Sequence, residues 1–440
     1  MTQAELPIAF VERMRARLGA EAEGFFQSLS EAPNISIVLN PRKPAGHPKD
    51  GTAVPWHPDG RYLKERPSFV ADPHYHAGTY YSQEASSMLV HAIVSELPLP
   101  PAPFCLDLCA APGGKSLAIL EAIAEQGFLV SNEVIRARTR ILIENLRKWG
   151  RANWLPASGH PSRWKTHEEL FDLILVDAPC SGEGMFRKEP NALSEWSEEN
   201  VQFCAQRQSS ILSDIAPCVK EGGFLIYSTC AYSEAENEAM VEEIRGLGLR
   251  PFNRSLPEKW GFVAIGENAF QAYPHRVKGE GFFLSVFQKG YSIVSKSDRQ
   301  SDDSLHVKEP IQMSIPDGFR IDHVKDAPQL NSVRFEEELR QLSDSRLLLE
   351  TGLNIGTYKG ENFIPSHSLA MSDLSQATPR VALEHAEAIK YLRRETFPLS
   401  VAQDGWYLVE YEGSVLGWVK VAAGRMKNHY PKEWMIRKRW

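Results

Sequence analysis

Five short apolar runs, separated by stretches with helical periodicity, lie between about residues 86 and 288 and constrain the fold more than any other feature. The runs cover residues 104–108, 128–131, 171–176, 224–227 and 281–287. Strands that alternate with helices in this way build a parallel sheet with helices on both faces. The sequence therefore predicts a doubly wound α/β core, in which ligands bind beyond the carboxyl ends of the strands.

Acidic and thiol side chains stand at the ends of these runs, where a ligand would bind. Asp107, Glu133, Asp177 and Cys230 occupy such positions, and Cys180 follows Asp177 by three residues. A thiolate is a strong nucleophile even when little of it is ionised, so two thiols at one edge offer a nucleophile and a helper group. A single cysteine more often only packs in a core. The placement of both thiols at strand ends, beside an acid, favours covalent catalysis instead.

A glycine-rich loop joins the first run to a helical stretch and reads Leu-Asp-Leu-Cys-Ala-Ala-Pro-Gly-Gly-Lys-Ser over residues 106–116. Glycines let the backbone approach a ligand closely, and the start of a helix offers free N–H donors. A phosphate-binding P-loop would need glycine five positions before Gly114, where Cys109 stands, and no G-x-G-x-x-G is present. ATP and dinucleotides therefore fit poorly, whereas S-adenosylmethionine, a nucleoside cofactor with no phosphate to cradle, fits best.

Glu133 lies twenty residues beyond Gly113, at the end of the second run. An acid at this place suits the two hydroxyls of a ribose. The same residue would also suit the first turn of the next helix, where a negative charge is favourable. On the residues alone, both interpretations stay open.

Three segments resemble the signature segments of the Nol/Nop/Sun family of RNA cytosine-5 methyltransferases. They are residues 107–116, residues 177–188 (Asp-Ala-Pro-Cys-Ser-Gly-Glu-Gly-Met-Phe-Arg-Lys) and residues 227–230. Residues 77–88 and 424–432 resemble the bacterial RsmF-like branch of that family, and the resemblance covers most of the chain except about residues 290–330. It implies a Rossmann-like methyltransferase core with a small N-terminal α+β RNA-binding unit and a C-terminal PUA-like domain.

We expect four regions along the 440 residues, a length at which single cores usually split. They are an N-terminal RNA-binding unit (1–85), the S-adenosylmethionine-dependent methyltransferase domain (86–289), a linker or flexible insert (290–325) and the PUA-like RNA-binding domain (326–440). Helices are expected at 9–18, 22–29 and 382–394, and a strand at 35–39. The alternating runs 405–411 and 415–421, joined by three turn-like residues, predict a hairpin.

The resemblance also implies a covalent mechanism. Carbon 5 of a pyrimidine is a poor nucleophile, so an enzyme must first add a thiolate to carbon 6. Cys230 resembles the family nucleophile, Cys180 the cysteine that assists release, and Asp177 the acid that hydrogen-bonds the ring at N3. Lys115 resembles the family lysine near this acid, with an exposed lysine at a helix start as the structural alternative.

The expected cofactor site follows the same resemblance. The turn 111–115 should approach the methionine part of S-adenosylmethionine and Glu133 the ribose, while Arg138 resembles a family arginine five residues past that acid. The family often has an acid near the adenine amino group where this chain has Ser158, which offers only a weaker, neutral hydrogen bond. The expected cofactor-binding residues are Asp107, Cys109, Ala110, Ala111, Pro112, Gly113, Gly114, Lys115, Glu133, Arg138, Ser158 and Asp177.

The distribution of charge and the spacing of the cysteines limit which partners and metals the chain can bind. The formal net charge of −7 argues against binding nucleic acid by bulk charge, but from Lys420 onward the chain holds seven Lys or Arg and the single acid Glu433. This end is either an RNA-facing patch or a solvated basic tail, and the resemblance favours RNA. The six cysteines have no metal-ligand spacing, and no apolar run suits a membrane span or a signal peptide. We therefore expect a cytoplasmic, soluble monomer without a metal.

The expected function is methylation of carbon 5 of a cytosine in RNA, and the RsmF-like resemblance implies ribosomal RNA of the small subunit. Transfer RNA is the alternative substrate. A DNA cytosine methyltransferase would use Cys180 for attack and would leave Cys230 without a role. A catalytically idle RNA assembly factor would have no chemical need for both cysteines and Asp177.

Overall fold

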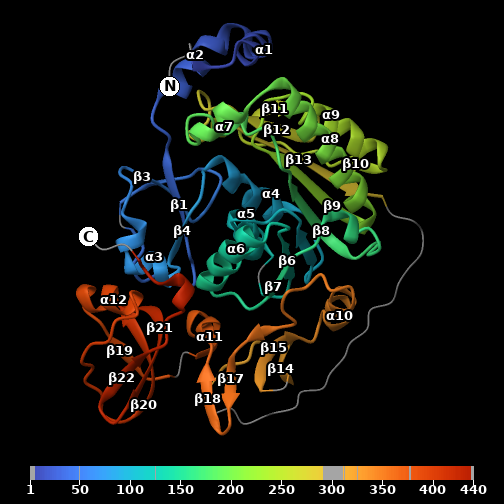
Figure 1. The fold of residues 1–440 in the computed structure, drawn as a ribbon. Helices are drawn as coiled ribbons and strands as arrows, with labels where there is room; N and C mark the ends of the chain where they lie inside the picture. Colours follow the sequence, from blue (N-terminus) through green and yellow to red (C-terminus); the bar gives the residue numbers. More distant parts are fainter. Residues whose placement is uncertain are drawn as a thin grey trace.

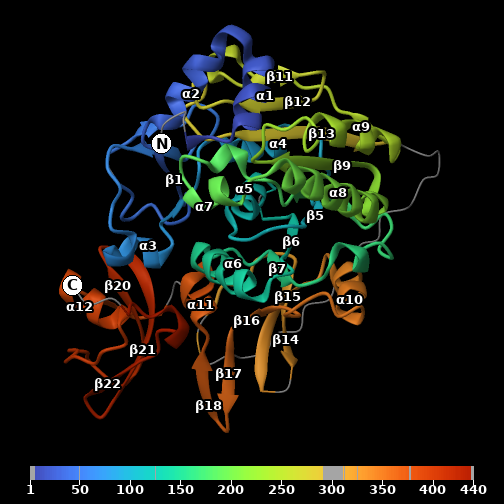
Figure 2. The same cartoon turned by 45° about the horizontal axis from the view of Figure 1, so that its top comes forward.

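The computed structural model describes residues 5–437, apart from 49, 124, 291–310, 312, 325, 376 and 377. Most of the expected linker therefore lies outside the described residues. Figure 1 shows an N-terminal segment in blue, a central sheet with helices on both sides, and a C-terminal part in orange and red. In both views the C-terminal part lies against the central domain and the lower end of the N-terminal unit (Figures 1 and 2).

Among the described residues, the central sheet has nine strands, in the order β11-β12-β13-β9-β8-β5-β6-β7 with β10 paired to β13. Its parallel half consists of β5 (Phe104–Asp107), β6 (Phe128–Asn132), β7 (Trp154–Ala157), β8 (Phe171–Asp177) and β9 (Val219–Thr229). The strand order reverses between β5 and β8, which pair in parallel. Doubly wound sheets bind ligands at this switch point. The Rossmann-like core expected from the sequence is confirmed.

The other half of the sheet is antiparallel, so the expectation of a wholly parallel sheet is wrong for the run 281–287. That run forms β13 (Phe282–Lys289), which pairs antiparallel with β9. The remaining strands of this half are β10 (Leu249–Pro251), β11 (Val263–Ile265) and β12 (Ala269–Ala272). The chain passes from β12 to β13 without a helix, and such a short connection can join antiparallel strands but not parallel ones.

Side chains alternate along the parallel strands and divide the core into two layers. Cys105 and Leu129 pack on one face with α4, α5 and α6, while Leu106 and Val130 pack on the other with α8 and α9. The helices are α4 (Leu89–Glu96), α5 (Gly114–Ala122), α6 (Arg136–Trp149), α8 (Glu198–Ile215) and α9 (Glu238–Gly246). These two layers hold the switch-point edge of the sheet rigidly.

Helix α10 (Glu336–Asp344) belongs by its packing to the methyltransferase layer, although it follows the expected linker. Leu342 and Leu347 are fully buried in the same core layer as Leu106. The Ser158 N–H donates to the Leu347 carbonyl at 2.9 Å, which ties this segment to the end of β7. The methyltransferase core is therefore completed by residues far along the chain.

The N-terminal unit combines two helices with a small sheet. Helices α1 (Ile8–Leu18) and α2 (Ala22–Ser30) and strand β1 (Ile35–Leu39) confirm the three expected elements to within one residue. The described sheet has the order β2-β3-β1-β4, with β2 (Thr52–Ala53), β3 (Gly60–Leu63) and β4 (Tyr80–Ser82), and the short helix α3 (Pro73–Ala77) precedes β4. Phe10 and Phe25 of the helices pack on Phe186 and Tyr232 of the central domain, near α7 (Pro190–Glu195).

The C-terminal part contains a sheet with the order β19-β20-β21-β22. Strands β20 (Gly405–Tyr411) and β21 (Ser414–Ala422) form the expected hairpin, and α12 (His385–Leu392) is shorter than the expected helix. The other elements are β14 (Phe319–Val324), β15 (Ala327–Ser332), β16 (Leu353–Asn354), β17 (Gly356–Lys359), β18 (Asn362–Pro365), α11 (His367–Met371), β19 (Arg380–Ala382) and β22 (Arg425–Asn428). None of the described helices has the length and apolar character needed to cross a membrane.

Candidate active site

An ion pair lies at the carboxyl end of β8, at the switch point. Lys115 Nζ, in the first turn of α5, lies 2.8 Å from Asp177 Oδ2, and Ser228 Oγ donates to the other carboxylate oxygen at 2.8 Å. Burial disfavours the charged lysine, but the Asp177 carboxylate outweighs it and raises the pKa of Lys115 above its ordinary value. Lys115 is largely buried and paired, so its interpretation as an exposed helix-start lysine is wrong.

The two predicted thiols meet beside this ion pair. Cys180 Sγ lies 3.0 Å from Cys230 Sγ, and the Cys230 N–H donates to Cys180 Sγ at 3.3 Å. Both cysteines are free. The hydrogen bond with Cys230, together with burial, raises the pKa of Cys180 well above its ordinary value. Cys180 therefore holds its proton at neutral pH, which suits a proton donor better than a nucleophile.

A cavity of about 430 Å³ opens in front of the ion pair and Cys230. The predicted site residues that line it are Cys109, Ala110, Ala111, Pro112, Gly114, Lys115, Arg138, Asp177 and Cys230. Gly113 has a φ of +119° at the tight turn, a conformation that favours glycine. Asp107, Gly113, Glu133, Ser158 and Cys180 stand outside this lining.

Asp107 is fully buried behind the glycine-rich loop. Its Oδ2 accepts a hydrogen bond from Ser116 Oγ at 2.7 Å, while Oδ1 has no partner among the residues that the structure describes. Burial raises the pKa of Asp107 to about 7. Asp107 therefore lies at the end of β5 under the loop that lines the cavity, and its side chain does not itself line the cavity.

Glu133 connects the second strand to the loop through Arg138. Its Oε1 accepts from the Ile135 N–H at 2.9 Å, and its Oε2 lies 3.5 Å from Arg138, which also donates to the Ala111 carbonyl at 2.7 Å. Because α6 begins at Arg136, Glu133 precedes the helix, and its interpretation as a first-turn acid is wrong. The Ser158 N–H donates to the Leu347 carbonyl, so of this residue only the side-chain hydroxyl stands where the family often has an acid.

Several cavity residues were not expected from the sequence. Tyr81 and Gln83 come from the N-terminal unit, Met185 and Lys188 lie late in the segment 177–188, and Phe282 begins the antiparallel strand β13. Tyr81 and Gln83 lie in the segment 77–88, whose resemblance to the RsmF-like branch was the one available signal. The cavity is thus closed jointly by the N-terminal unit and the methyltransferase domain.

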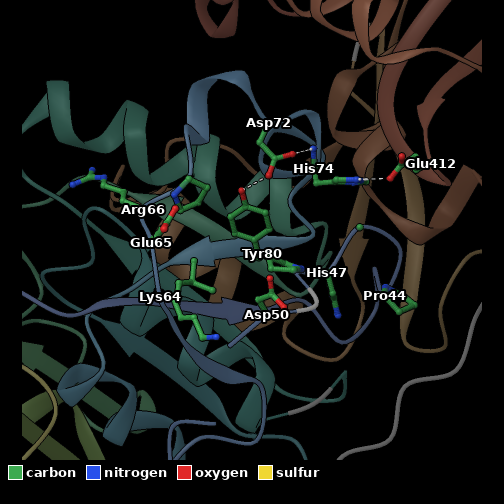
Figure 3. A pocket seen from close by; sticks show the side chains of 14 residues that line it. Pro44, His47, Asp50, Lys64, Glu65, Arg66, Asp72, His74, Tyr80 and Glu412 are labelled. Carbon is green, nitrogen blue, oxygen red and sulfur yellow. Dashed lines mark hydrogen bonds and ion pairs between the residues drawn. The ribbon is translucent and has the colours of Figure 1, made fainter. Parts of the chain in front are cut away.

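A second cavity, of about 800 Å³, lies where the N-terminal unit meets the C-terminal sheet (Figure 3). His74 reaches across this junction, with its Nε2 atom 3.2 Å from Glu412 Oε2. Lys64 and Arg66 alternate there with acidic residues, and Tyr80 hydrogen-bonds Asp72. None of the predicted site residues lines it among those described, whereas nine of them line the cavity beside Cys230.

Comparison with known proteins identifies the domains. Residues 6–85 match the N-terminal domain of 16S rRNA methyltransferase RsmF, residues 96–288 match 16S rRNA methyltransferase RsmB/F, and residues 378–436 match the methyltransferase RsmF PUA domain. The ribosomal RNA small subunit methyltransferase F of Aeromonas hydrophila is 30% identical over 421 residues, covering 86% of this chain and 84% of that protein. The chain belongs to the RsmF family of 16S rRNA methyltransferases. Members of the RsmF family are S-adenosylmethionine-dependent RNA methyltransferases, and the chain is an enzyme of this class.

Other relatives agree with the RsmF assignment. The Shewanella loihica protein of the same name is 28% identical, covering 86% of this chain and 83% of its own length. Among solved structures, a methyltransferase homologue from Pyrococcus horikoshii is 25% identical with a TM-score of 0.55, covering 66% of this chain and all of that one. NSun6 from the same organism, solved with SFG, has the same TM-score at 20% identity, covers 65% of this chain and 99% of its own, and supports the fold. About two thirds of the chain therefore shares its fold with these Pyrococcus horikoshii proteins.

Proposed function

We propose that this RsmF-family enzyme methylates carbon 5 of a cytosine in small-subunit ribosomal RNA through a covalent bond between Cys230 and carbon 6. The observation that carries the proposal is the meeting of Cys230, Cys180 and the Lys115–Asp177 pair at the switch point. Two thiols and a proton-holding pair are what attack and release at a pyrimidine ring require.

Attack begins with the Cys230 thiolate, which forms a bond to carbon 6 of the cytosine. Electron density moves onto the ring, where N3 accepts a hydrogen bond from Asp177 after Asp177 has taken a proton from Lys115. Carbon 5 is then an enamine carbon, and its electron pair would bond to the donor's methyl group as the methyl–sulfur bond breaks. Asp177 and Lys115 therefore serve the step in which the ring gains negative charge.

Release reverses the first bond. Carbon 5 gives its proton to solvent, the carbon 6–sulfur bond breaks, and the electron pair returns to Cys230 sulfur. Cys180 is placed to donate its thiol hydrogen to that sulfur, since the two sulfur atoms lie 3.0 Å apart and Cys180 keeps its proton at neutral pH. A better-stabilised leaving thiolate departs faster.

The residues present fit S-adenosylmethionine, which supplies an electrophilic methyl group when bound. We propose that the turn 111–115 holds the methionine part, with the Asp107 carboxyl behind it as an acceptor, and that Glu133 and Arg138 hold the ribose side. Ser158 leaves the adenine with a weaker contact than an acid would give. This arrangement brings the cofactor to the same cavity as Cys230.

The substrate proposal rests on the domain matches and on charge. The C-terminal unit matches an RsmF PUA domain, and the edge strand β22 exposes Arg425 and Lys427. We infer that this strand binds the RNA backbone, while the cavity takes the target base. A ribosomal RNA substrate would also set the enzyme in the cytoplasm.

Transfer of a labelled methyl group tests the function. The protein would be incubated with tritiated S-adenosylmethionine and, separately, with 16S rRNA, small ribosomal subunits and transfer RNA, and bisulfite sequencing would locate the modified cytosine. We expect label in 16S rRNA or in the small subunit. Label in transfer RNA alone would support the alternative substrate, and no label in any RNA would support an assembly factor without catalysis.

A further inference from the structure

Two consecutive buried residues, Glu236 and Asn237, connect the loops that carry the two thiols. They lie in the turn just before α9, and both side chains are fully buried. Neither side chain lines the cavity beside Cys230. Each reaches toward a different cysteine loop, so a two-residue segment holds both.

Glu236 binds the loop of Cys180. Its two carboxylate oxygens accept from the Ser181 N–H at 2.8 Å and from Ser181 Oγ at 2.6 Å. Gln208 Nε2, on α8, donates to the same carboxylate at 3.2 Å and to the Pro179 carbonyl at 3.0 Å. The residues on both sides of Cys180 are therefore fixed to one buried acid and its amide neighbour.

Asn237 binds the loop of Cys230 in the same manner. Thr229 Oγ1 donates to Asn237 Oδ1 at 2.6 Å and accepts from the Ala231 N–H at 3.2 Å. Asn237 Nδ2 donates to the Ala231 carbonyl at 3.0 Å. The residues on both sides of Cys230 are thus held by Asn237, and Gln271 Nε2 adds a longer hydrogen bond to the Ala231 carbonyl at 3.4 Å.

A buried carboxylate without hydrogen bonds is strongly unfavourable, and a hydrophobic residue would fill the same space at less free-energy cost. The donors that Glu236 receives come from Ser181 and Gln208, which serve the Cys180 loop. Such a network specifies one arrangement of the backbone rather than adding net stability. What it specifies here is where each sulfur lies.

We propose that Glu236 and Asn237 are positioning residues that set the distance between the two thiols, Glu236 through Ser181 and Asn237 through Thr229 and Ala231. The inference rests on the proposed function, in which Cys180 serves release and Cys230 serves attack. We call the hydrogen bonds from Glu236 to the Cys180 loop the Cys180 arm, and those from Asn237 to the Cys230 loop the Cys230 arm. Weakening the hydrogen bonds of Glu236 should slow release and leave attack unchanged, and weakening those of Asn237 should slow attack and leave release unchanged.

The test compares two conservative variants by two readouts. Glu236→Gln keeps the size of the side chain but turns one acceptor for Ser181 into a donor. It should slow release about tenfold, so that the denaturation-resistant protein–RNA adduct accumulates while methyl transfer in a single turnover stays within about threefold of the natural enzyme. Asn237→Asp removes the donor to the Ala231 carbonyl and should slow single-turnover transfer about tenfold without accumulating adduct.

In case Glu236→Gln or Asn237→Asp prevents folding, a second pair of variants changes the hydrogen-bond partners Ser181 and Thr229 instead. Ser181→Ala should repeat the Glu236→Gln effect, and Thr229→Val should repeat the Asn237→Asp effect while Thr229→Ser restores the rate. The matched control is Asn268→Ala, because Asn268 is equally buried and donates to the Val286 carbonyl at 2.7 Å, away from both thiols. The control should lower stability and leave the ratio of adduct to methylated RNA unchanged.

The inference would be supported if the ratio of adduct to methylated RNA rose in Glu236→Gln and fell in Asn237→Asp. The same ratio in Glu236→Gln, Asn237→Asp and the control would overturn it, and the residues would be structural only. Cys180→Ala is measured alongside. If Cys180→Ala forms no adduct, the proposed function is wrong, and the inference that rests on it is wrong as well. Failure of the proposed function is thus seen in Cys180→Ala, whereas failure of the inference alone is seen in Glu236→Gln and Asn237→Asp.

Discussion

The sulfur atoms of Cys180 and Cys230 lie 3.0 Å apart although the two residues are 50 positions apart in the chain. The sheet explains this contact, because β8 and β9 are parallel neighbours in which Asp177 is level with Ser228. Cys180 comes three residues after the end of β8 and Cys230 directly after the end of β9, so both loops emerge at one edge. Under the proposed mechanism, this contact joins the nucleophile, Cys230, to the thiol that assists release, Cys180.

Glu133→Ala should weaken S-adenosylmethionine binding roughly tenfold to one hundredfold, since a hydrogen bond to a charged group contributes about 1.5–3 kcal/mol. RNA affinity should be nearly unchanged, because Glu133 is buried behind the cavity. Calorimetry with each ligand measures both. Glu144→Ala is the control, an acid on α6 that pairs with Lys148; equal cofactor affinity in the two variants would remove Glu133 from the cofactor site.

Replacing Arg425 and Lys427 of β22 by alanine should weaken RNA binding and flatten its salt dependence, by about 0.7–0.9 in log–log slope for each phosphate that the variant no longer neutralises. Cofactor affinity should not change. The control is Arg334→Ala with Arg340→Ala at α10, which removes the same charge at the other end of the C-terminal part (Figures 1 and 2). If both double variants gave the same salt slope, β22 would be only a solvated surface.

Point changes are preferable to truncation at residue 326 for this purpose. Phe335 and Leu347 are buried in the methyltransferase core, and the Leu349 N–H donates to the Pro156 carbonyl at 2.9 Å. A truncated chain would expose that core layer, and weaker RNA binding would then report damaged folding.

Asp107→Asn should reduce the dependence of stability on pH. Burial raises the pKa of Asp107 to about 7 in the folded protein, against 3.8 ordinarily, so the folded state keeps a proton that the unfolded chain has released. The stabilising contribution of protonated Asp107 is complete below pH 4 and is lost as the pH rises through 7. Between pH 5 and pH 8 this loss should lower the free energy of unfolding by an amount on the order of 2 kcal/mol. Urea unfolding at both pH values measures it, and parallel pH dependences for variant and natural protein would contradict the burial argument.

The residues at the strand ends could be predicted because each lies within a few positions of a clear apolar run. Asp177 and Cys230 illustrate this, since a parallel sheet must bring such ends to one edge. The antiparallel direction of β13 could not be predicted from its apolar pattern, which carries no direction. It depends on the connection from β12, which has no helix.

Long-range contacts also escaped prediction. Leu347 completes a core layer whose other residues lie mostly between positions 104 and 287. No local sequence pattern predicts that contact. Glu236 and Asn237 look like ordinary acids and amides at a helix start, and their proposed positioning role depends on partners from β9, α8 and the Cys180 loop. The residues at the strand ends were thus easier to identify from the sequence than the hydrogen bonds that hold their loops.

The most direct test of the covalent account is the fate of the RNA in the two cysteine variants, resolved on a denaturing gel. With S-adenosylmethionine and substrate RNA both supplied, Cys180→Ala should transfer the methyl group and accumulate a protein–RNA adduct, because attack by Cys230 survives and release is slowed. Cys230→Ala should give neither methylation nor adduct. An adduct in Cys230→Ala and none in Cys180→Ala would instead assign attack to Cys180, as in a DNA-type enzyme, and methylation surviving in both variants would contradict thiol catalysis altogether.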